Sequence, residues 1–189
     1  KSIISKIKKL QHGEFLSVKN EGGIAYKFSA KEVLGLHKIK ITHSVEHNES
    51  LKVLHYPWQI FLLYDWAIRQ DFELITARRK SKPISKTNTI INVAQIFIEA
   101  GAKVEHCTLN ASTGPIYIGK NAEIQEGTMI RGPFALCEGS LVKMGSKIYG
   151  ATTIGPYCLA GGEIKNSILL GYSNKAHDGY LGDSVIGEW

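Results

Sequence analysis

The sequence has few cysteines and no long apolar run, and both absences narrow the class of protein. Cys107, Cys137 and Cys158 are the three cysteines among 189 residues, an odd number without the close pairing of a zinc site or a disulfide framework. No stretch approaches the roughly 20 apolar residues that cross a bilayer, and the chain opens without a signal peptide. We therefore expect a cytoplasmic protein without a membrane partner.

The common nucleotide-binding loops are also missing. Neither G-x-G-x-x-G nor G-x-x-x-x-G-K-[ST] occurs, so a Rossmann or P-loop interpretation has no support. The net charge of +6 favours small anionic partners such as phosphates, phosphosugars or coenzyme A. The densest basic run, residues 77–83, contains no aromatic residue. We interpret it as a solvated loop and expect no nucleic-acid partner.

Residues 1–90 have the pattern of a mixed α/β segment. Residues 2–11 resemble the end of a helix, and residues 14–29 predict a hairpin around a turn at residues 20–23. Ser29 is suited to cap a short helix over residues 29–36. Residues 56–72 predict a helix with Pro57 in its first turn. Its apolar residues cover nearly every face, so we expect it to be buried, with Trp58, Phe61 and Trp66 in the core.

From about residue 91 the sequence follows a period of six. Steps of six from Ile118 meet eight aliphatic residues in succession: Ile118, Ile124, Ile130, Leu136, Val142, Ile148, Ile154 and Ala160. Four places after each of the first seven stands a small residue, except for one phenylalanine: Ala122, Thr128, Phe134, Ser140, Ser146, Thr152 and Cys158. Ile98 and Val104 have the same spacing upstream. Neither an α-helix nor a hairpin strand has this period.

A six-residue repeat indicates short strands stacked in a parallel β-helix, with one aliphatic side chain of each hexad pointing inward. Ile118, Leu136 and Ile154 lie three hexads apart and should stack on one inner face. The period breaks at residues 109–117, which hold two extra residues, and again at residues 161–183, after which it resumes at Ile186. We expect both breaks to be loops on an edge, where sites are commonly built.

Three segments then resemble a known family. Residues 130–135 (IRGPFA), 161–167 (GGEIKNS) and 175–187 (KAHDGYLGDSVIG) resemble the left-handed β-helix domain of the bifunctional N-acetylglucosamine-1-phosphate uridyltransferase and glucosamine-1-phosphate acetyltransferase family, and most of all its divergent sugar nucleotidyltransferase-like branch. The resemblance implies a left-handed β-helix over residues 91–189, preceded at residues 1–90 by the end of a nucleotidyltransferase domain, and a homotrimer. We expect the chain to be a piece of a longer protein, with an incomplete acetyl-CoA site and no activity alone.

The resemblance also implies a chemistry. The β-helix would transfer an acetyl group from acetyl-CoA to an amino-sugar 1-phosphate in nucleotide-sugar synthesis of the UDP-N-acetylglucosamine type, and the nucleotidyltransferase part would use Mg²⁺. The catalytic base falls on His177, the phosphate-binding lysine on Lys165 and the sugar-binding tyrosine on Tyr180, with Lys175 as a further substrate ligand. The family's arginine after G-P-F-A is missing here. Arg131, Lys143 and Lys147 are the candidate replacements, and we include Arg131 in the predicted site.

Two alternatives stay open. In the first, the protein is a sugar-1-phosphate nucleotidyltransferase, and its β-helix is only an oligomerisation scaffold. In the second, it is a β-helix hydratase that binds zinc through histidines between subunits. Such a site needs three histidines on the coils, and only His106 and His177 lie in the repeat. His43 and His47 would pair on a helix but have no third ligand near them in the sequence, so we predict no metal site.

Overall fold

The structure, a computed structural model, describes residues 3–18, 22–27, 43–47 and 52–188. The chain divides into two compact units, Lys1–Val53 and Leu54–Trp189. The division lies well before residue 90, where the change in sequence pattern suggested a domain boundary. The domain boundary itself stays a prediction, but the helix expected in the first domain belongs to the same compact unit as the repeat.

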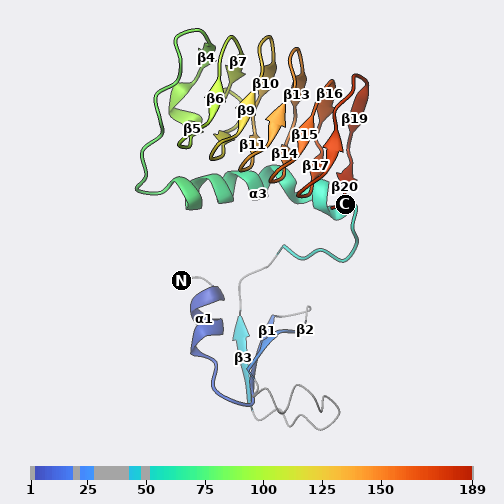
Figure 1. The fold of residues 1–189 in the computed structure, drawn as a ribbon. Helices are drawn as coiled ribbons and strands as arrows, with labels where there is room; N and C mark the ends of the chain where they lie inside the picture. Colours follow the sequence, from blue (N-terminus) through green and yellow to red (C-terminus); the bar gives the residue numbers. More distant parts are fainter. Residues whose placement is uncertain (1–2, 19–21, 28–42, 48–51, 189) are drawn as a thin grey trace. The chain divides into compact units, whose positions relative to one another are not determined.

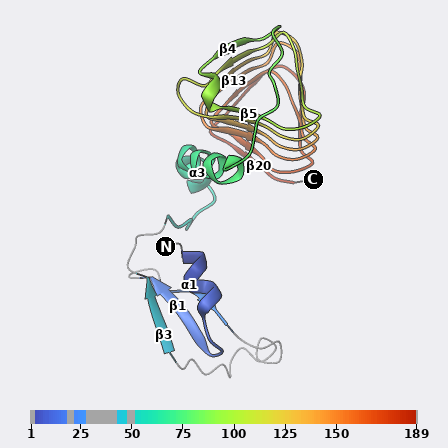
Figure 2. The same cartoon turned by 90° about the vertical axis from the view of Figure 1, so that its left-hand side faces the viewer.

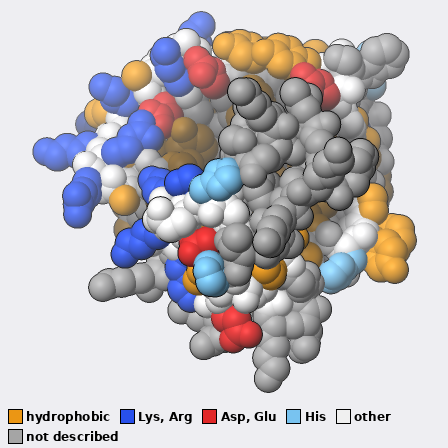
Figure 3. Space-filling view, turned by 90° about the horizontal axis from the view of Figure 1, so that it is seen from below, with side chains coloured by type: hydrophobic (Ala, Val, Ile, Leu, Met, Phe, Trp, Pro, Cys, Tyr) orange, Lys and Arg blue, Asp and Glu red, His pale blue; other side chains and the backbone are white. Residues whose placement is uncertain are grey.

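The first unit is a small α/β arrangement. Helix α1 (Ile3–Lys9) precedes the strands β1 (Glu14–Val18), β2 (Gly22–Tyr26) and β3 (His43–His47), which form a sheet in the order β2-β1-β3. β1 and β2 are antiparallel, which confirms the predicted hairpin, and α1 confirms the predicted helix end. The centre of the predicted turn and the helix expected at residues 29–36 lie outside the described residues. The last turn of α1 carries Lys6, Lys8 and Lys9, and Lys and Arg side chains are coloured blue in the view from below (Figure 3).

The histidine pair of the first unit lies on a strand. β3 runs from His43 to His47 and pairs in parallel with β1. Four residues of extended chain span about 13 Å, whereas the same four residues on a helix would bring both side chains to one metal ion. The placement of this pair on a helix was therefore wrong.

The second unit is built from stacked three-sided coils (Figures 1 and 2). The first sheet contains β4 (Thr89–Ile91), β7 (Thr108–Asn110), β10 (Met129–Arg131), β13 (Lys147–Tyr149), β16 (Glu163–Lys165) and β19 (Tyr180–Gly182). The second contains β5 (Ile96–Ile98), β8 (Ile116–Ile118), β11 (Phe134–Leu136), β14 (Thr152–Ile154), β17 (Ile168–Leu169) and β20 (Val185–Ile186). The third contains β6 (Lys103–Val104), β9 (Glu123–Ile124), β12 (Leu141–Val142), β15 (Leu159–Ala160) and β18 (Asn174–Lys175), and a 3₁₀ turn, η2 (Val93–Gln95), joins β4 to β5.

All three sheets are parallel, as a β-helix requires, and the arrangement is consistent with the left-handed form. All eight aliphatic residues of the six-residue period are at most 2% exposed. The seven residues four places later, Phe134 included, are at most 3% exposed. Ile118, Leu136 and Ile154 lie side by side in register on β8, β11 and β14. The predicted core and its register are confirmed.

The two breaks in the period have different structures. The first is an enlarged corner between β7 and β8, as the two extra residues predicted. The second is not one loop, so that prediction was wrong. The coils continue with shorter steps: Ile164 pairs with Ile148, Leu169 with Ile154 and Lys175 with Ala160. Stepping by six missed these residues because the spacing falls to four and five, and because a lysine takes an inward position.

Helix α3 (Gln59–Thr76) lies along the second sheet (Figures 1 and 2). Tyr64 hydrogen-bonds Thr153 of β14, and burial raises its pKa. Arg69 donates to the carbonyl of Thr113 over 2.7 Å. Trp58 and Trp66 are 56% and 47% exposed, so the helix packs by one face, and the prediction that they belong to the core was wrong. Among the described residues, no helix has both the length and the apolar character needed to cross a bilayer.

The basic run after α3 is partly fixed to the coils. Arg79 forms an ion pair with Glu99 at 2.6 Å and lies over the ring of Phe97, 5.2 Å from its centre. Tyr117 also donates to Glu99, over 2.8 Å. Arg79 is therefore an anchor between the end of α3 and the second sheet, and the solvated-loop interpretation does not apply to this residue.

The burial of the inward aliphatic residues predicts that two leucine substitutions differ greatly in their effect on the free energy of unfolding. Leu136 is fully buried, so Leu136→Asp should lower the free energy of unfolding by about 4 kcal/mol or more, because the carboxylate would have no partner in the core. Leu170→Asp, at a position that is 48% exposed, should lower it by less than about 1 kcal/mol. Urea denaturation measures both values. Leu136→Ala, expected to cost about 3 kcal/mol, provides the measurement if Leu136→Asp does not fold, and equal costs at the two positions would contradict the register.

Candidate functional site

Three of the predicted site residues share the outer face of the first sheet. Lys165 on β16 is in register with Tyr149 on β13. Ile130 pairs with Ile148, and Arg131 and Tyr149 are the residues that directly follow them. Arg131 and Tyr149 therefore lie in the same outward row. Tyr180 on β19 is in register with Glu163 in the adjacent outward row. Parallel pairing therefore brings together residues that are far apart in the sequence.

A groove lies on the same face. It has a volume of about 460 Å³ and is lined mainly by outward side chains of three neighbouring strands. These are Thr108 and Asn110 from β7, Met129 and Arg131 from β10, and Lys147 and Tyr149 from β13. Lys147 and Tyr149 continue in register to Glu163 and Lys165, so the groove adjoins the other predicted site residues.

The structure separates the three candidates for the missing arginine. Arg131 and Lys147 both line the groove. Lys143 instead follows β12 of the third sheet, where its N–H donates to Ala160. Of the two residues on the correct face, Arg131 lies in the row of Lys165. Because both side chains are long, exposed and two strands apart, they can reach the same anion.

Sequence reasoning missed Tyr149 and Glu163, two polar residues of this face. The Tyr149 hydroxyl donates to Oε1 of Glu163 over 2.5 Å. This hydrogen bond to a carboxylate raises the pKa of Tyr149 to about 12. Glu163 could have been found, because it stands two residues before Lys165 and alternate residues of a strand share a face. Tyr149 could not be found without the register between β13 and β16.

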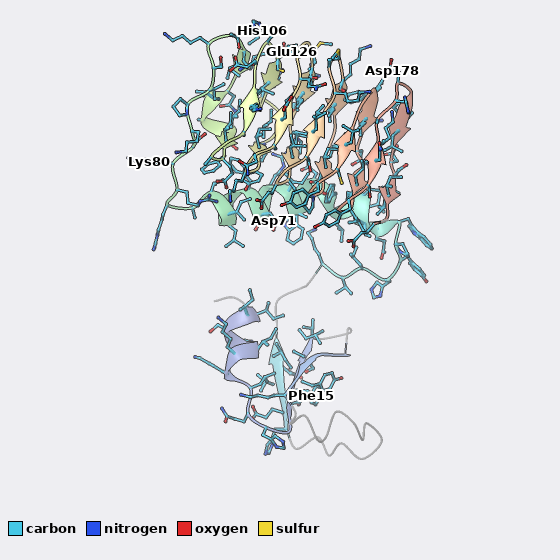
Figure 4. All side chains as sticks on the ribbon, in the orientation of Figure 1. Phe15, Asp71, Lys80, His106, Glu126 and Asp178 are labelled. Carbon is cyan, nitrogen blue, oxygen red and sulfur yellow. The ribbon has the colours of Figure 1, made fainter. Side chains whose placement is uncertain are left out.

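His177 lies at the corner where the third sheet gives way to the first. It occupies the exposed bend between β18 and β19, three residues before Tyr180. Figure 4 shows its neighbour Asp178 along the same edge as His106 and Glu126, on the side of the coils away from α3. The predicted base is therefore at the margin of the face that carries Arg131, Lys165 and Tyr180.

Lys175 makes its contacts with the backbone of this corner. Its ammonium group donates to the carbonyl oxygens of Gly161 (2.7 Å), His177 (2.6 Å) and Gly179 (3.0 Å). Partial burial lowers the pKa of Lys175. The role of a substrate ligand stays a prediction for this residue, whose three N–H donors are all directed to the protein's own carbonyls.

Neither thiols nor histidines form a second reactive centre in the part of the chain that the structure describes. Burial raises the pKa of Cys107, Cys137 and Cys158, which keeps them as protonated thiols. His106 and His177 stand at the same corner but four coils apart, about 19 Å at the usual strand spacing. The described residues contain no group of three His, Cys, Asp or Glu that could hold a metal ion.

Comparison with known proteins relates the first part of the chain to a family. Residues 1–80 match the model of a family described as sugar nucleotidyl transferase. The match covers less than half of the chain and spans the first unit and α3. It supports a sugar nucleotidyltransferase-like protein, and therefore a transferase. No curated protein matches the chain.

Proposed function

We propose that the outer face of the first sheet binds an amino-sugar 1-phosphate and that its amino group is acetylated there by acetyl-CoA. The observation that carries the proposal is the convergence of Arg131, Lys165 and Tyr180 on one face, with His177 at its margin. The family similarity of residues 1–80 supports a substrate that is a sugar phosphate.

The two cations account for binding of the phosphate. Arg131 and Lys165 lie two strands apart, about 10 Å between their backbones, and both side chains are exposed. A guanidinium can hold two phosphate oxygens with parallel hydrogen bonds, and an ammonium adds a compact charge. The Tyr180 hydroxyl, on the neighbouring row, is suited to hydrogen-bond a sugar hydroxyl.

The amine must lose a proton as it attacks the thioester carbonyl. An imidazole is the side chain that most readily accepts a proton near neutral pH, and His177 is exposed to solvent at the margin of the sugar face. The new C–N bond forms as the C–S bond breaks, and the amine proton passes to His177 and from its imidazolium to the departing thiolate, so coenzyme A leaves as its thiol. Holding the amine and the thioester together contributes a further part of the rate.

Removing the base should slow acetylation without weakening sugar binding. His177→Ala in the full-length protein should lower kcat for acetyl transfer by about 10²- to 10⁴-fold, the range for a lost acid–base group. Coenzyme A release with a thiol reagent measures the rate. His106→Ala is the matched control, an exposed histidine at the same corner, and should leave the rate unchanged. An unaltered rate in His177→Ala would remove this histidine from the mechanism.

The phosphate-binding pair makes a separate prediction. Arg131→Ala and Lys165→Ala should each weaken binding of glucosamine 1-phosphate by about 10- to 100-fold, as expected for a lost charge-assisted hydrogen bond. Titration calorimetry measures the change. Lys120→Ala removes an equal charge from an exposed lysine whose nearest ionic contact is with Glu138 at 3.9 Å, and it should have little effect. Uniform small losses in all three variants would reflect only net charge and would contradict a phosphate site on this face.

Nucleotidyl transfer, with the β-helix as a scaffold, is the second candidate function, and the match of residues 1–80 favours it. The substrates separate the two. Acetyl transfer requires a sugar nitrogen, so the full-length protein should release coenzyme A with glucosamine 1-phosphate but not with glucose 1-phosphate. Pyrophosphate release from a nucleoside triphosphate, dependent on added Mg²⁺ and without coenzyme A release, would instead assign nucleotidyl transfer as the activity.

We also propose that the protein acts in the cytoplasm as a homotrimer assembled through the β-helix. Because α3 lies along the second sheet, the extended outer faces of the first and third sheets are the ones suited to pack against other copies. Light scattering at micromolar concentration should therefore give three times the mass of one chain. A monomer mass at these concentrations would contradict this assembly.

A further inference from the structure

The His177 bend stands over a shorter turn of the preceding coil. Between the inward residues Ala160 and Ile164, the chain turns the corner with three residues. Between Lys175 and Leu181, the next coil turns the same corner with five. Both ends of the longer turn are held in register on the shorter one, so its two additional residues bulge beyond that shorter turn. Residues 176–179 form this bulge, and His177 is part of it.

The shorter turn has no side chains where the bulge approaches it. A Cβ on Gly161 would lie 2.6 Å from the carbonyl oxygen of Ala176. A Cβ on Gly162, which has a φ of +77°, would lie 2.8 Å from the carbonyl oxygen of Gly179 and 2.9 Å from Nζ of Lys175. The two glycines therefore form a backbone seat for the bulge, and any larger residue would displace it.

Lys175 joins the bulge to this seat. One of its hydrogen bonds reaches Gly161 in the seat, and the other two reach His177 and Gly179 in the bulge. The lysine stands in register with Ala160, at a position that earlier coils fill with Val142 and Ile124. An ammonium has three N–H donors, and all three are used here. The chain thus places a charge in an otherwise aliphatic row, and that charge fixes the carbonyl of the predicted base.

We propose that Lys175 is a positioning residue that holds the backbone of His177 at the margin of the sugar-binding face. The inference rests on the proposed acetyl transfer, in which His177 is the base. It replaces the role of direct substrate ligand expected for Lys175, because no donor of the ammonium is left for a phosphate. A displacement of about 1 Å in a catalytic group can slow a reaction by about 10²-fold, so a clamp on the base affects the rate more than the binding of substrate.

The test is Lys175→Met in the full-length protein, with Lys175→Arg and Lys120→Met beside it. Lys175→Met keeps an unbranched apolar stem and removes the three donors. It should lower kcat for acetyl transfer by about 10-fold or more, while KM for glucosamine 1-phosphate stays within about 3-fold. Hydrogen exchange of residues 176–179 should become faster. Lys175→Arg keeps donors and should recover part of the rate, and Lys120→Met should change neither measurement.

The outcomes separate the possible roles. A raised KM with unchanged exchange at residues 176–179 would show that Lys175 is a substrate ligand and would overturn the inference. Unchanged kcat with faster exchange would also overturn it, since the clamp would then be structural only. If the unsubstituted protein transfers no acetyl group, the proposed function fails. Unchanged exchange in Lys175→Met would then reject the clamp itself, whereas faster exchange would retain it and exclude only its role in acetyl transfer.

Discussion

Parallel pairing between successive coils is the constraint on which the rest of the second unit depends. Each coil repeats the inward column of the previous one, and Ile118, Leu136 and Ile154 lie side by side with almost no exposed surface. Because side chains alternate along a strand, a slip of one residue would turn the inward side chain outward and bury a polar one. The aliphatic column therefore also determines which polar residues share an outer face, Arg131 and Lys165 among them.

The sequence predicted this column well wherever successive hexads have the same length and the same packing. A period of six, with an aliphatic and a small residue in each hexad, follows from packing alone and needs no knowledge of partners. The prediction from this period failed after Ala160, where the spacing between inward residues shortens and Lys175 takes a position in the column. A lysine is expected on the surface unless its ammonium is paired, and the pairing here is with carbonyls whose positions exist only in the folded coils. Similarly, the apolar residues of α3 predicted a helix but not which of its faces would be covered.

The sequence predicted which residues belong to the candidate site better than it predicted how those residues are arranged. Lys165 and Tyr180 came from motifs, and their common face follows from the pairing of β16 with β19. Arg131 was already in the predicted site, but its separation from Lys143 by one corner of the coil is visible only in the structure. The hydrogen bond from Tyr149 to Glu163 also depends on pairing between coils, which spacing along one strand does not reveal.

The order of residues along the rows has an electrostatic consequence. Arg131 and Lys165 stand on either side of Tyr149, so two like charges that both favour an anion are not directly adjacent. Glu163, the one carboxylate of the β13–β16 pair, belongs to the other row and accepts a hydrogen bond from the Tyr149 hydroxyl. A phosphate between Arg131 and Lys165 would then meet two cations and no acid in its own row. The net positive charge of the chain favours anions in general, whereas this local order would favour an anion in the row of Arg131, Tyr149 and Lys165.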